Sequence, residues 1–328
     1  MAKKIMKIGV MTSGGDAPGM NAAIRAVVRA CAYYNVKCFG YYRGYEGIIE
    51  NDFIELTSRS VKNIINKGGT MLKSARSEEF RLAEGRKKAY DNLKSEDVDA
   101  LVLIGGDGTF TGGALFSKEF DIPVIGIPGT IDNDIYGTQF TIGYDTALNT
   151  VVEAVDKIRD TASSHNRLFF VEVMGRDAGF IALNSGIGAG AEEILIPEED
   201  QPLEKLLESL KRSKISGKTS SIVIVAEGDK TGKNVFELAE YVKENLDDYS
   251  PRVTVLGHLQ RGGSPSCFDR VLASRLGVKA VELLLDGKKD IMVGVRNNEV
   301  VATPIIEIMR CKNSINKELL RISDILSI

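Results

Sequence analysis

The sequence of 328 residues has no tryptophan, few other aromatic residues, two histidines and four cysteines. Scarce aromatics and a net charge of -3 argue against base-stacking surfaces, and against nucleic acid or membrane as a partner. The cysteines form no C-x-x-C pair and no metal-ligand spacing, so we expect reduced thiols in a cytoplasmic protein. No apolar run approaches the roughly 20 residues of a membrane helix. The first run breaks at TSGGD, which favours a strand over a signal peptide.

The chain does contain a regular alternation of short apolar runs and helical patterns. The apolar runs predict strands at residues 7–12, 36–42, 99–106, 123–128, 167–175, 221–228 and 252–258. Apolar stripes at helical spacing predict helices that include residues 24–31, 148–158, 202–212 and 236–246. This alternation predicts an α/β fold with mainly parallel sheets covered on both faces. The length of the chain predicts two compact units.

Ligands of such folds bind at the carboxyl ends of the strands. The loops expected there carry glycines, acids and arginines, but almost no nucleophile paired with a base. Residues 14–16 read GGD and residues 105–109 read GGDGT, each between a strand and a helix, where backbone N–H groups can approach phosphate. Asp107 among these glycines is the kind of ligand that magnesium (Mg2+) takes beside phosphate oxygens. A tight turn and a helix cap are the simpler explanations.

Two acids and a set of arginines extend this pattern. Residues 128–134 read PGTIDND and place Asp132 and Asp134 where a buried strand ends, as either a turn or an active site. His258 suits the role of a hydrogen-bond donor to phosphate, and His165 suits a structural role. Neither has a serine or cysteine partner for acyl transfer. Arginine binds phosphate through planar bidentate contacts, and arginines recur at strand ends or in adjoining loops: Arg76, Arg167, Arg176, Arg252 and Arg261.

Several strings, taken together and in order, resemble the bacterial ATP-dependent 6-phosphofructokinase family: TSGGDAPGMNAAIR, KSARSEEFR, IGGDGT, PGTIDNDI, RDTASSHNR, VEVMGR and GHLQRGGSP. The resemblance implies transfer of the γ-phosphoryl group of ATP to the 1-hydroxyl of fructose 6-phosphate, with Mg2+ as cofactor. The products would be fructose 1,6-bisphosphate and ADP. It also implies the phosphofructokinase fold, which has two three-layer α/β/α domains, and a cytoplasmic homotetramer with active sites shared between subunits.

The resemblance places the larger, ATP-binding domain at residues 1–140 plus 256–305. The smaller domain, which would bind fructose 6-phosphate, is expected at residues 141–255 plus 306–328, with the active site between the two.

Roles for individual residues follow from the same resemblance. Asp132 matches the base that accepts the proton of the attacking hydroxyl, with Asp134, Thr130, Arg76 and Arg176 as the other catalytic residues. The expected ATP contacts are Gly15, Tyr45, Arg76, Ser77, Gly106, Asp107, Gly108 and Thr109, and Asp107 would also hold Mg2+. The expected sugar contacts are Thr130, Ile131, Asp132, Arg167, Met174, Gly175, Arg176, Glu227, Arg252, His258, Leu259, Gln260 and Arg261. Among these, Arg167 and Arg252 would reach the 6-phosphate from a neighbouring subunit.

An effector site for ADP or phosphoenolpyruvate is common in the family. The residues that match it are Arg25, Arg29, Arg159, Gly190, Glu192 and Lys218. Ser58, Asn63, Ser216 and Ser220 stand where an Arg, an Asp, a Lys and a His are usual, which predicts a weaker or altered response. Lys73 is a further departure, because the family usually has Gly before SAR.

Three other functions stay open as alternatives. Pyrophosphate-dependent relatives carry Asp for the last Gly of GGDG and Lys for the Gly of PGTIDND, whereas Gly108 and Gly129 stand here and favour ATP. Lipid and NAD kinases share GGDGT but lack the TIDND and HLQRGG strings. A non-catalytic sugar-phosphate sensor on the same scaffold would need none of Asp107, Asp132 and Asp134.

Overall fold

The computed structural model describes residues 5–163, 167–200, 202–215, 221–247 and 249–327. Its contacts divide the chain into two compact units, each with its own sheet. The first unit comprises Met1–Ile131, Ile135–Thr146 and Arg261–Asn313. The second unit comprises Asp132–Asp134, Ala147–Gln260 and Ser314–Ile328.

The first unit is built on a seven-stranded sheet in the order β11-β10-β5-β4-β1-β2-β3. Its inner strands pair in parallel, and both edge strands pair antiparallel to their neighbours. The central strands are buried almost throughout, because helices cover both faces of the sheet. The strands are β1 (Lys7–Thr12), β2 (Lys37–Tyr41), β3 (Phe53–Leu56), β4 (Ala100–Gly105), β5 (Val124–Pro128), β10 (Ile291–Arg296) and β11 (Glu299–Pro304).

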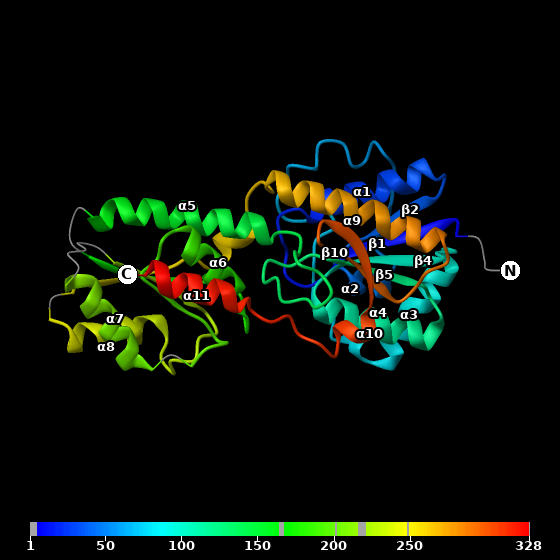
Figure 1. The fold of residues 1–328 in the computed structure, drawn as a ribbon. Helices are drawn as coiled ribbons and strands as arrows, with labels where there is room; N and C mark the ends of the chain where they lie inside the picture. Colours follow the sequence, from blue (N-terminus) through cyan, green and yellow to red (C-terminus); the bar gives the residue numbers. More distant parts are fainter. Residues whose placement is uncertain (1–4, 164–166, 201, 216–220, 248, 328) are drawn as a thin grey trace. The chain divides into compact units, whose positions relative to one another are not determined.

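Two long helices cover one face of this sheet (Figure 1): α1 (Met20–Tyr33) and α9 (Cys267–Leu285). They approach closely, since a Cβ added at Gly277 of α9 would lie 2.6 Å from the Cβ of Ala26 in α1. The predicted stripe of α1, from Ile24 to Cys31, is buried. The other face carries α2 (Tyr45–Glu50), the 3-10 helix η1 (Glu79–Arg81), α3 (Ala83–Ser95), α4 (Asp107–Phe120) and α10 (Ile305–Ile308).

The second unit has a four-stranded, fully parallel sheet in the order β7-β8-β6-β9. These strands are β6 (Leu168–Val173), β7 (Glu193–Leu195), β8 (Ser221–Ala226) and β9 (Pro251–Val255). Its apolar core joins side chains of β6 and β8 with those of α7 (Leu203–Ile215) and α8 (Val235–Asn245). The unit also holds α5 (Tyr144–Ser163), which begins in the first unit, α6 (Phe180–Gly188), the 3-10 helix η2 (Gly257–Arg261) and α11 (Lys317–Leu326), which packs against α6.

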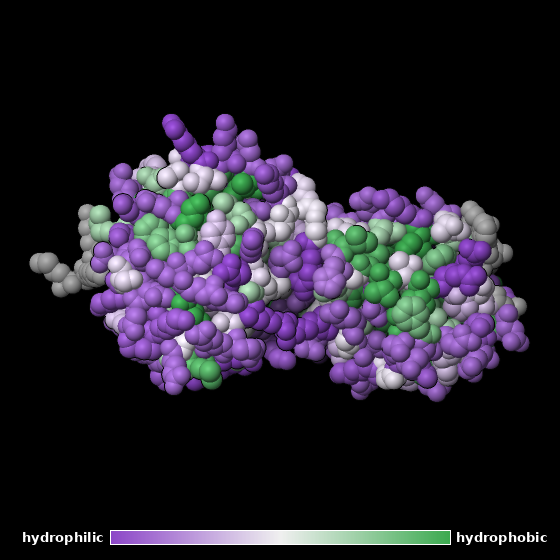
Figure 2. Space-filling view, turned by 180° about the vertical axis from the view of Figure 1, so that it is seen from behind, coloured by the Kyte–Doolittle hydropathy of each residue, from purple (hydrophilic) through white to green (hydrophobic). Residues whose placement is uncertain are grey.

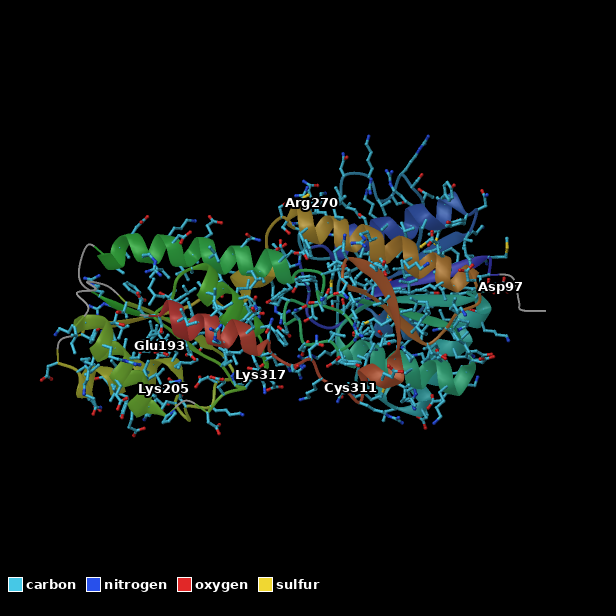
Figure 3. All side chains as sticks on the ribbon, in the orientation of Figure 1. Asp97, Glu193, Lys205, Arg270, Cys311 and Lys317 are labelled. Atoms are coloured by element: carbon cyan, nitrogen blue, oxygen red, sulfur yellow. The ribbon has the colours of Figure 1, made fainter. Side chains whose placement is uncertain are left out.

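The predicted α/β fold with mainly parallel sheets is confirmed, and each predicted strand and helix overlaps one in the structure. The four cysteines are free, as expected; Cys31 and Cys38 are buried, and Cys311 lies on the exposed segment that follows α10 (Figure 3). Among the described residues, no helix combines the length and the apolar character needed to cross a bilayer. In the reverse view (Figure 2), apolar residues form a broad patch on the part of the molecule at the right and smaller patches on the part at the left, among hydrophilic residues.

Candidate active site

The loop after β1 holds a glycine pair against an arginine from a distant part of the chain. Gly14 has a φ of 87°, in the left-handed region that favours glycine. A Cβ added at Gly15 would lie 2.3 Å from Nη1 of Arg261, so this arginine lies directly against the glycine backbone. The same Nη1 donates a hydrogen bond to the Asp16 carbonyl at 3.1 Å. Gly15 and Arg261, predicted as ATP and sugar contacts, therefore meet in the first unit.

A second loop is fastened to the end of β1. The buried Thr12 hydroxyl donates to the Lys73 carbonyl at 2.7 Å and lies 2.9 Å from Oγ1 of Thr70. The Ser74 hydroxyl donates to the Gly14 carbonyl. Lys73 has a φ of 58°, which is the left-handed conformation that a glycine would adopt without strain.

The predicted ATP contacts Arg76 and Ser77 follow this loop directly. Arg76 is exposed, and the Ser77 hydroxyl accepts a hydrogen bond from the Phe80 N–H at 3.3 Å. Since the loop is tied to Gly14, residues 76 and 77 are held near the first glycine loop of the same unit.

The loop after β4 leads directly into α4, and there is open space over the first turn of this helix. A Cβ added at Gly106 or at Gly108 would meet nothing within 4 Å, and neither residue has a positive φ. The packing of the chain therefore does not require glycine at either position. By contrast, a Cβ at Gly105 would lie 2.5 Å from the Ser13 carbonyl oxygen. The start of a 14-residue helix, with open space over Gly106 and Gly108, suits the binding of an anion.

Tyr45 supports this loop from the apolar core. Its ring stacks on Phe80 with centroids 3.9 Å apart, and its hydroxyl donates to the Thr109 carbonyl at 2.5 Å. Burial raises the pKa of the Tyr45 hydroxyl well above its ordinary value. The structure thus gives Tyr45 a buried role beneath α4, and its contact with ATP stays a prediction.

The residues around Asp107 fit a magnesium ion. Asp107 is the first residue of α4, its side chain is exposed, and open glycines stand on both sides of it. Within the described part of the chain, no three His, Cys, Asp or Glu residues cluster as a complete metal site. Mg2+ usually takes one or two protein carboxylates and completes its shell with phosphate oxygens and water, so an exposed carboxylate beside a phosphate cradle is sufficient.

The PGTIDND segment begins as a buried strand and ends in an acid triplet. β5 ends at Pro128, and the triplet of residues 132–134 lies between Ile131 and Ile135, which are both fully buried. Asp132 is 8% exposed. Asn133 has a φ of 55°, an uncommon conformation for a residue other than glycine. The two isoleucines thus anchor the chain on either side of the acids.

The second unit gathers the predicted sugar contacts at the carboxyl ends of β6 and β8. The Arg176 N–H donates to Glu227 Oε1 at 2.6 Å, and the Met174 N–H donates to Gln260 Oε1 at 3.3 Å. Gly175 between them has a φ of 146°, and Gln260 is fully buried. His258 and Leu259 are exposed on η2.

Arg167 and Arg252 lie at the other end of the same sheet. Arg167 immediately precedes β6, and Arg252 pairs in register with Phe169 at the start of β9. Because a strand rises about 3.3 Å per residue, the length of β6 separates these arginines from Met174 by about 20 Å. The second unit of one chain therefore does not bring them to its own predicted sugar contacts.

Glu172 of β6 was not predicted from the sequence as a site residue, although its carboxyl senses the charge of the predicted sugar contact Glu227. It is the one charged residue within the apolar strand LFFVEV, and it is half-buried. Burial, followed by the charges of Glu227 and Asp229, raises the pKa of its carboxyl. A charged residue inside a buried strand was the signal that could have identified it.

The predicted effector residues fall into separate groups. In the second unit, Arg159 donates to the Gly190 carbonyl at 2.8 Å and lies 4.0 Å from the carboxylate of Glu192. In the first unit, Arg25 and Arg29 lie one turn apart on α1, where burial and the charge of Arg29 lower the pKa of Arg25. Three residues discussed for the effector site lie outside the described residues: Ser216, Lys218 and Ser220. His165, for which we expect a structural role, also lies outside them.

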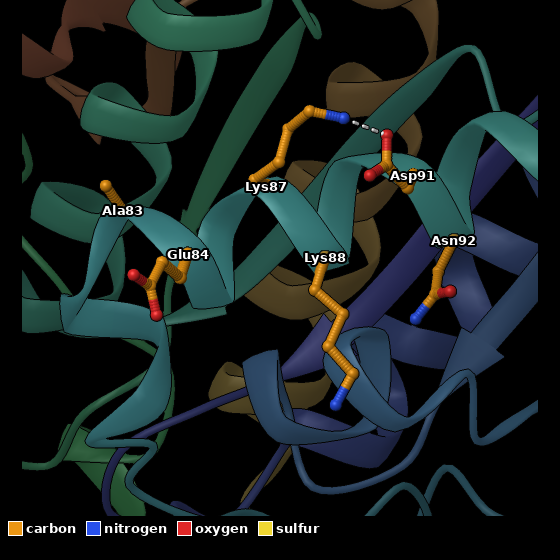
Figure 4. Close-up of a pocket in the computed structure, with 6 residues that line it drawn as sticks. All are labelled: Ala83, Glu84, Lys87, Lys88, Asp91 and Asn92. Atoms are coloured by element: carbon orange, nitrogen blue, oxygen red, sulfur yellow. Dashed lines mark hydrogen bonds and ion pairs between the residues drawn. The ribbon is translucent and has the colours of Figure 1, made fainter.

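A surface pocket on α3 is separate from these groups. It is lined by Ala83, Glu84, Lys87, Lys88, Asp91 and Asn92, and Lys87 pairs with Asp91 (Figure 4). None of the predicted site residues lines it, so α3 offers positions for control variants.

Within the first unit, the two glycine loops and Arg261 provide open backbone and positive charge of the kind that binds phosphate groups. The phosphofructokinase family model matches residues 7–284, and the chain belongs to this family. It is 54% identical over 321 residues to ATP-dependent 6-phosphofructokinase 2 of Bacteroides thetaiotaomicron, covering 98% of each chain. It is 55% identical over 318 residues to ATP-dependent 6-phosphofructokinase of Cytophaga hutchinsonii, covering 97% of each chain. These findings confirm the resemblance drawn from the motifs.

Solved structures agree on the fold. Phosphofructokinase from Saccharomyces cerevisiae superposes with a TM-score of 0.89 and 38% identity, over 93% of this chain. The match spans 45% of the yeast chain, so this chain corresponds to less than half of that protein's length. A pyrophosphate-dependent phosphofructokinase from Marinobacter aquaeolei has a TM-score of 0.85 at 23% identity, over 96% of this chain and 86% of that one.

Proposed function

We propose that this chain is an ATP-dependent 6-phosphofructokinase. It transfers the γ-phosphoryl group of ATP to the 1-hydroxyl of fructose 6-phosphate and gives fructose 1,6-bisphosphate and ADP, the committed step of glycolysis. The observation that carries the proposal is the open space over Gly106 and Gly108, at a helix N-terminus that requires no glycine for its own packing. Relatives that match along nearly the whole chain bear the same name, which supports the choice of substrates.

The nucleotide phosphates bind over the two glycine loops of the first unit. Backbone N–H groups at Gly15, Gly106 and Gly108 approach the phosphates, and the start of α4 adds a favourable dipole. Asp107 would hold Mg2+, which would supply positive charge to offset that of the phosphates. The remaining ATP contacts are Tyr45, Arg76, Ser77 and Thr109.

Asp132 serves as the base for the sugar hydroxyl. A carboxylate at this position accepts the proton as the oxygen attacks, which contributes about 10²–10⁴-fold. Asp134 and Thr130 assist, while Arg76 and Arg176 offset charge on the group in transfer. Such a reaction depends mainly on positioning and charge neutralisation, so no covalent nucleophile is required.

The sugar phosphate binds through Met174, Gly175, Arg176, Glu227, His258, Leu259, Gln260 and Arg261, together with Thr130 and Ile131. Arg167 and Arg252 act on a neighbouring subunit of a homotetramer. Their place at the amino ends of β6 and β9 supports this assignment, because they lie about 20 Å along the sheet from Met174. The protein acts in the cytoplasm.

An effector, either ADP or phosphoenolpyruvate, binds near Arg159, Gly190 and Glu192, with Arg25, Arg29 and Lys218. The contact between Arg159 and the Gly190 carbonyl supports part of this group. The substitutions at Ser58, Asn63, Ser216 and Ser220 weaken or alter the response.

The test of the proposed base compares Asp132→Asn with Asp91→Asn, an exposed acid on α3 that is not among the predicted site residues (Figure 4). Asp132→Asn should lower turnover by about 10²–10⁴-fold while fructose 6-phosphate still binds. Asp91→Asn should match the wild type. A retained turnover above a tenth of the wild-type value in Asp132→Asn would contradict the assignment.

A further inference from the structure

The segment that carries the acid triplet leaves β5 and returns to it as a closed loop. The Ile142 N–H donates to the Pro128 carbonyl at 2.9 Å, and Gly129 and Ile142 form an isolated parallel bridge. Residues 130–141 therefore leave and return at one point of the sheet. Both ends of this loop are therefore attached to the sheet next to β5.

Two side chains outside the PGTIDND string hold the carbonyls that flank the triplet. On the near side, the Thr141 hydroxyl donates to the Thr130 carbonyl at 2.6 Å, and Thr141 is fully buried. On the far side, Nδ2 of Asn313 donates to the Ile135 carbonyl at 2.8 Å and to the Thr138 carbonyl at 3.4 Å. Asn313 lies in the segment between α10 and α11, two residues after Cys311 (Figure 3).

These contacts fix two peptide groups that each lie one residue from the acids, Thr130–Ile131 before the triplet and Ile135–Tyr136 after it. A hydrogen bond to a carbonyl limits rotation of its peptide plane, and so limits the direction of the neighbouring Cα–Cβ bonds. The triplet contains Asn133 in a left-handed conformation, which persists only where the surroundings hold it. Ile131 and Ile135 are buried on either side of the triplet, and the two donors restrain the backbone beyond them.

The rest of the loop has independent attachments. The Gln139 N–H donates to the Val295 carbonyl at 2.8 Å, and the Val295 N–H donates to the Thr138 hydroxyl at 3.0 Å. The Asn297 N–H donates to Oε1 of Gln139 at 2.8 Å. Loss of one flanking donor should therefore shift the acids locally and leave the loop attached to β10.

We propose that Thr141 and Asn313 are positioning residues for the phosphoryl transfer, since they hold the carbonyls on either side of Asp132 and Asp134. This proposal rests on the proposed function, in which Asp132 is the base. Asn313 lies beyond residue 284, where the match to the family model ends, so the role is assigned from its contacts alone.

The first arm of the test changes Thr141. Thr141→Val keeps the shape and removes the donor, whereas Thr141→Ser keeps the donor and removes a methyl group. Because a misplacement of about 1 Å can cost about 10²-fold in rate, Thr141→Val should lower kcat at least tenfold with KM for both substrates nearly unchanged. Thr141→Ser should retain most of kcat. Equal kcat values in the two variants would overturn the role of Thr141.

The second arm changes Asn313, which is only partly buried, so the variant should fold. Asn313→Asp replaces the donor by an oxygen that faces two carbonyl oxygens, and kcat should again fall at least tenfold at constant KM. Asn316→Asp is the matched control: it adds the same charge three residues later, at the N-cap of α11, where a carboxylate also accepts the Glu318 N–H. Equal kcat in these two variants would overturn the role of Asn313.

Asp132→Asn, measured in parallel, separates the two proposals. If Asp132→Asn is inactive while Thr141→Val and Asn313→Asp keep wild-type kcat, the positioning proposal alone fails. If Asp132→Asn keeps full turnover, the base is wrong, and the positioning proposal that depends on it fails as well.

Discussion

Replacement of Gly108 by aspartate would place a carboxylate in the open space at the start of α4. The Cβ would meet nothing within 4 Å, and the φ of Gly108 does not lie in the left-handed region. The fold should therefore accept the side chain without strain. If the phosphates of ATP occupy that space, the new charge lies against them.

The expected penalty follows from Coulomb's law. Two unit charges about 4 Å apart, at an effective dielectric constant of about 20, repel by about 4 kcal/mol. This corresponds to about a thousandfold, since each tenfold step in affinity is about 1.4 kcal/mol. Gly108 is exposed, and salt screens part of the repulsion, so we expect kcat/KM for ATP to fall by about 10²–10³-fold.

The assay measures initial rates against ATP concentration and, separately, thermal unfolding. Gly108→Asn is the control, because it has the shape of aspartate without the charge, and it should lose much less of kcat/KM. Both variants should unfold at the wild-type temperature. The reasoning would be refuted if Gly108→Asp lost no more than Gly108→Asn, or if its loss came with a lower unfolding temperature.

Two predictions concern stability. Arg86→Ala should lower the free energy of unfolding by about 3 kcal/mol, since the buried guanidinium donates to Glu119 at 2.6 and 2.8 Å and to the Phe80 and Arg81 carbonyls. A urea titration that gave a loss under about 1 kcal/mol would contradict this. The hydrogen bond from Arg86 lowers the pKa of Glu119, so this stabilisation is present above about pH 4.3 and is lost as pH falls through the lower folded-state value. The difference in the free energy of unfolding between the wild type and Arg86→Ala should therefore become smaller as the pH falls below about 4.3. Burial raises the pKa of Asp269 to about 6, against hydrogen bonds that favour its ionised form. Stability should therefore rise as pH falls from about 6 to about 4, and Asp269→Asn should remove this dependence from thermal unfolding curves, whereas an unchanged slope would contradict it.

Most of the sheet could be predicted because its inner strands are continuous apolar runs. The runs that became β1, β4, β5, β6 and β8 are buried on both faces, and such strands leave a clear pattern. β3 and β7 were missed because they are short and carry a glutamate among few apolar residues. β10 and β11 form a hairpin with Asn297 and Asn298 at its turn, both with positive φ, and this Asn-Asn pair was the available signal.

The candidate site was predictable as a set of loops and not as a geometry. The rule that ligands bind at strand ends selected the GGD, GGDGT and PGTIDND strings. Sequence spacing carries no information on which side chains meet, so the contact of Arg261 with Gly15 needed the structure. The same holds for Asn313, whose amide reaches a carbonyl 178 residues earlier in the chain.

The direction of a strand also decides which end a residue occupies. Arg167 and Arg252 adjoin strands, as predicted, but they lie at the amino ends of β6 and β9. Because the strands are parallel, both arginines lie at the amino ends of the strands, whereas Met174 and Glu227 lie at the carboxyl ends. The predicted strands at residues 167–175 and 252–258 already begin with these arginines, whereas their level across the sheet follows from the register.

The most direct test of the central claim is product formation from fructose 6-phosphate and Mg2+, with ATP and pyrophosphate compared as donors in parallel. The proposed function predicts fructose 1,6-bisphosphate with ATP and none with pyrophosphate. Turnover with pyrophosphate would mean that Gly108 and Gly129 do not set the donor. No turnover with either donor would contradict the kinase assignment and return the sugar-phosphate sensor as the better account.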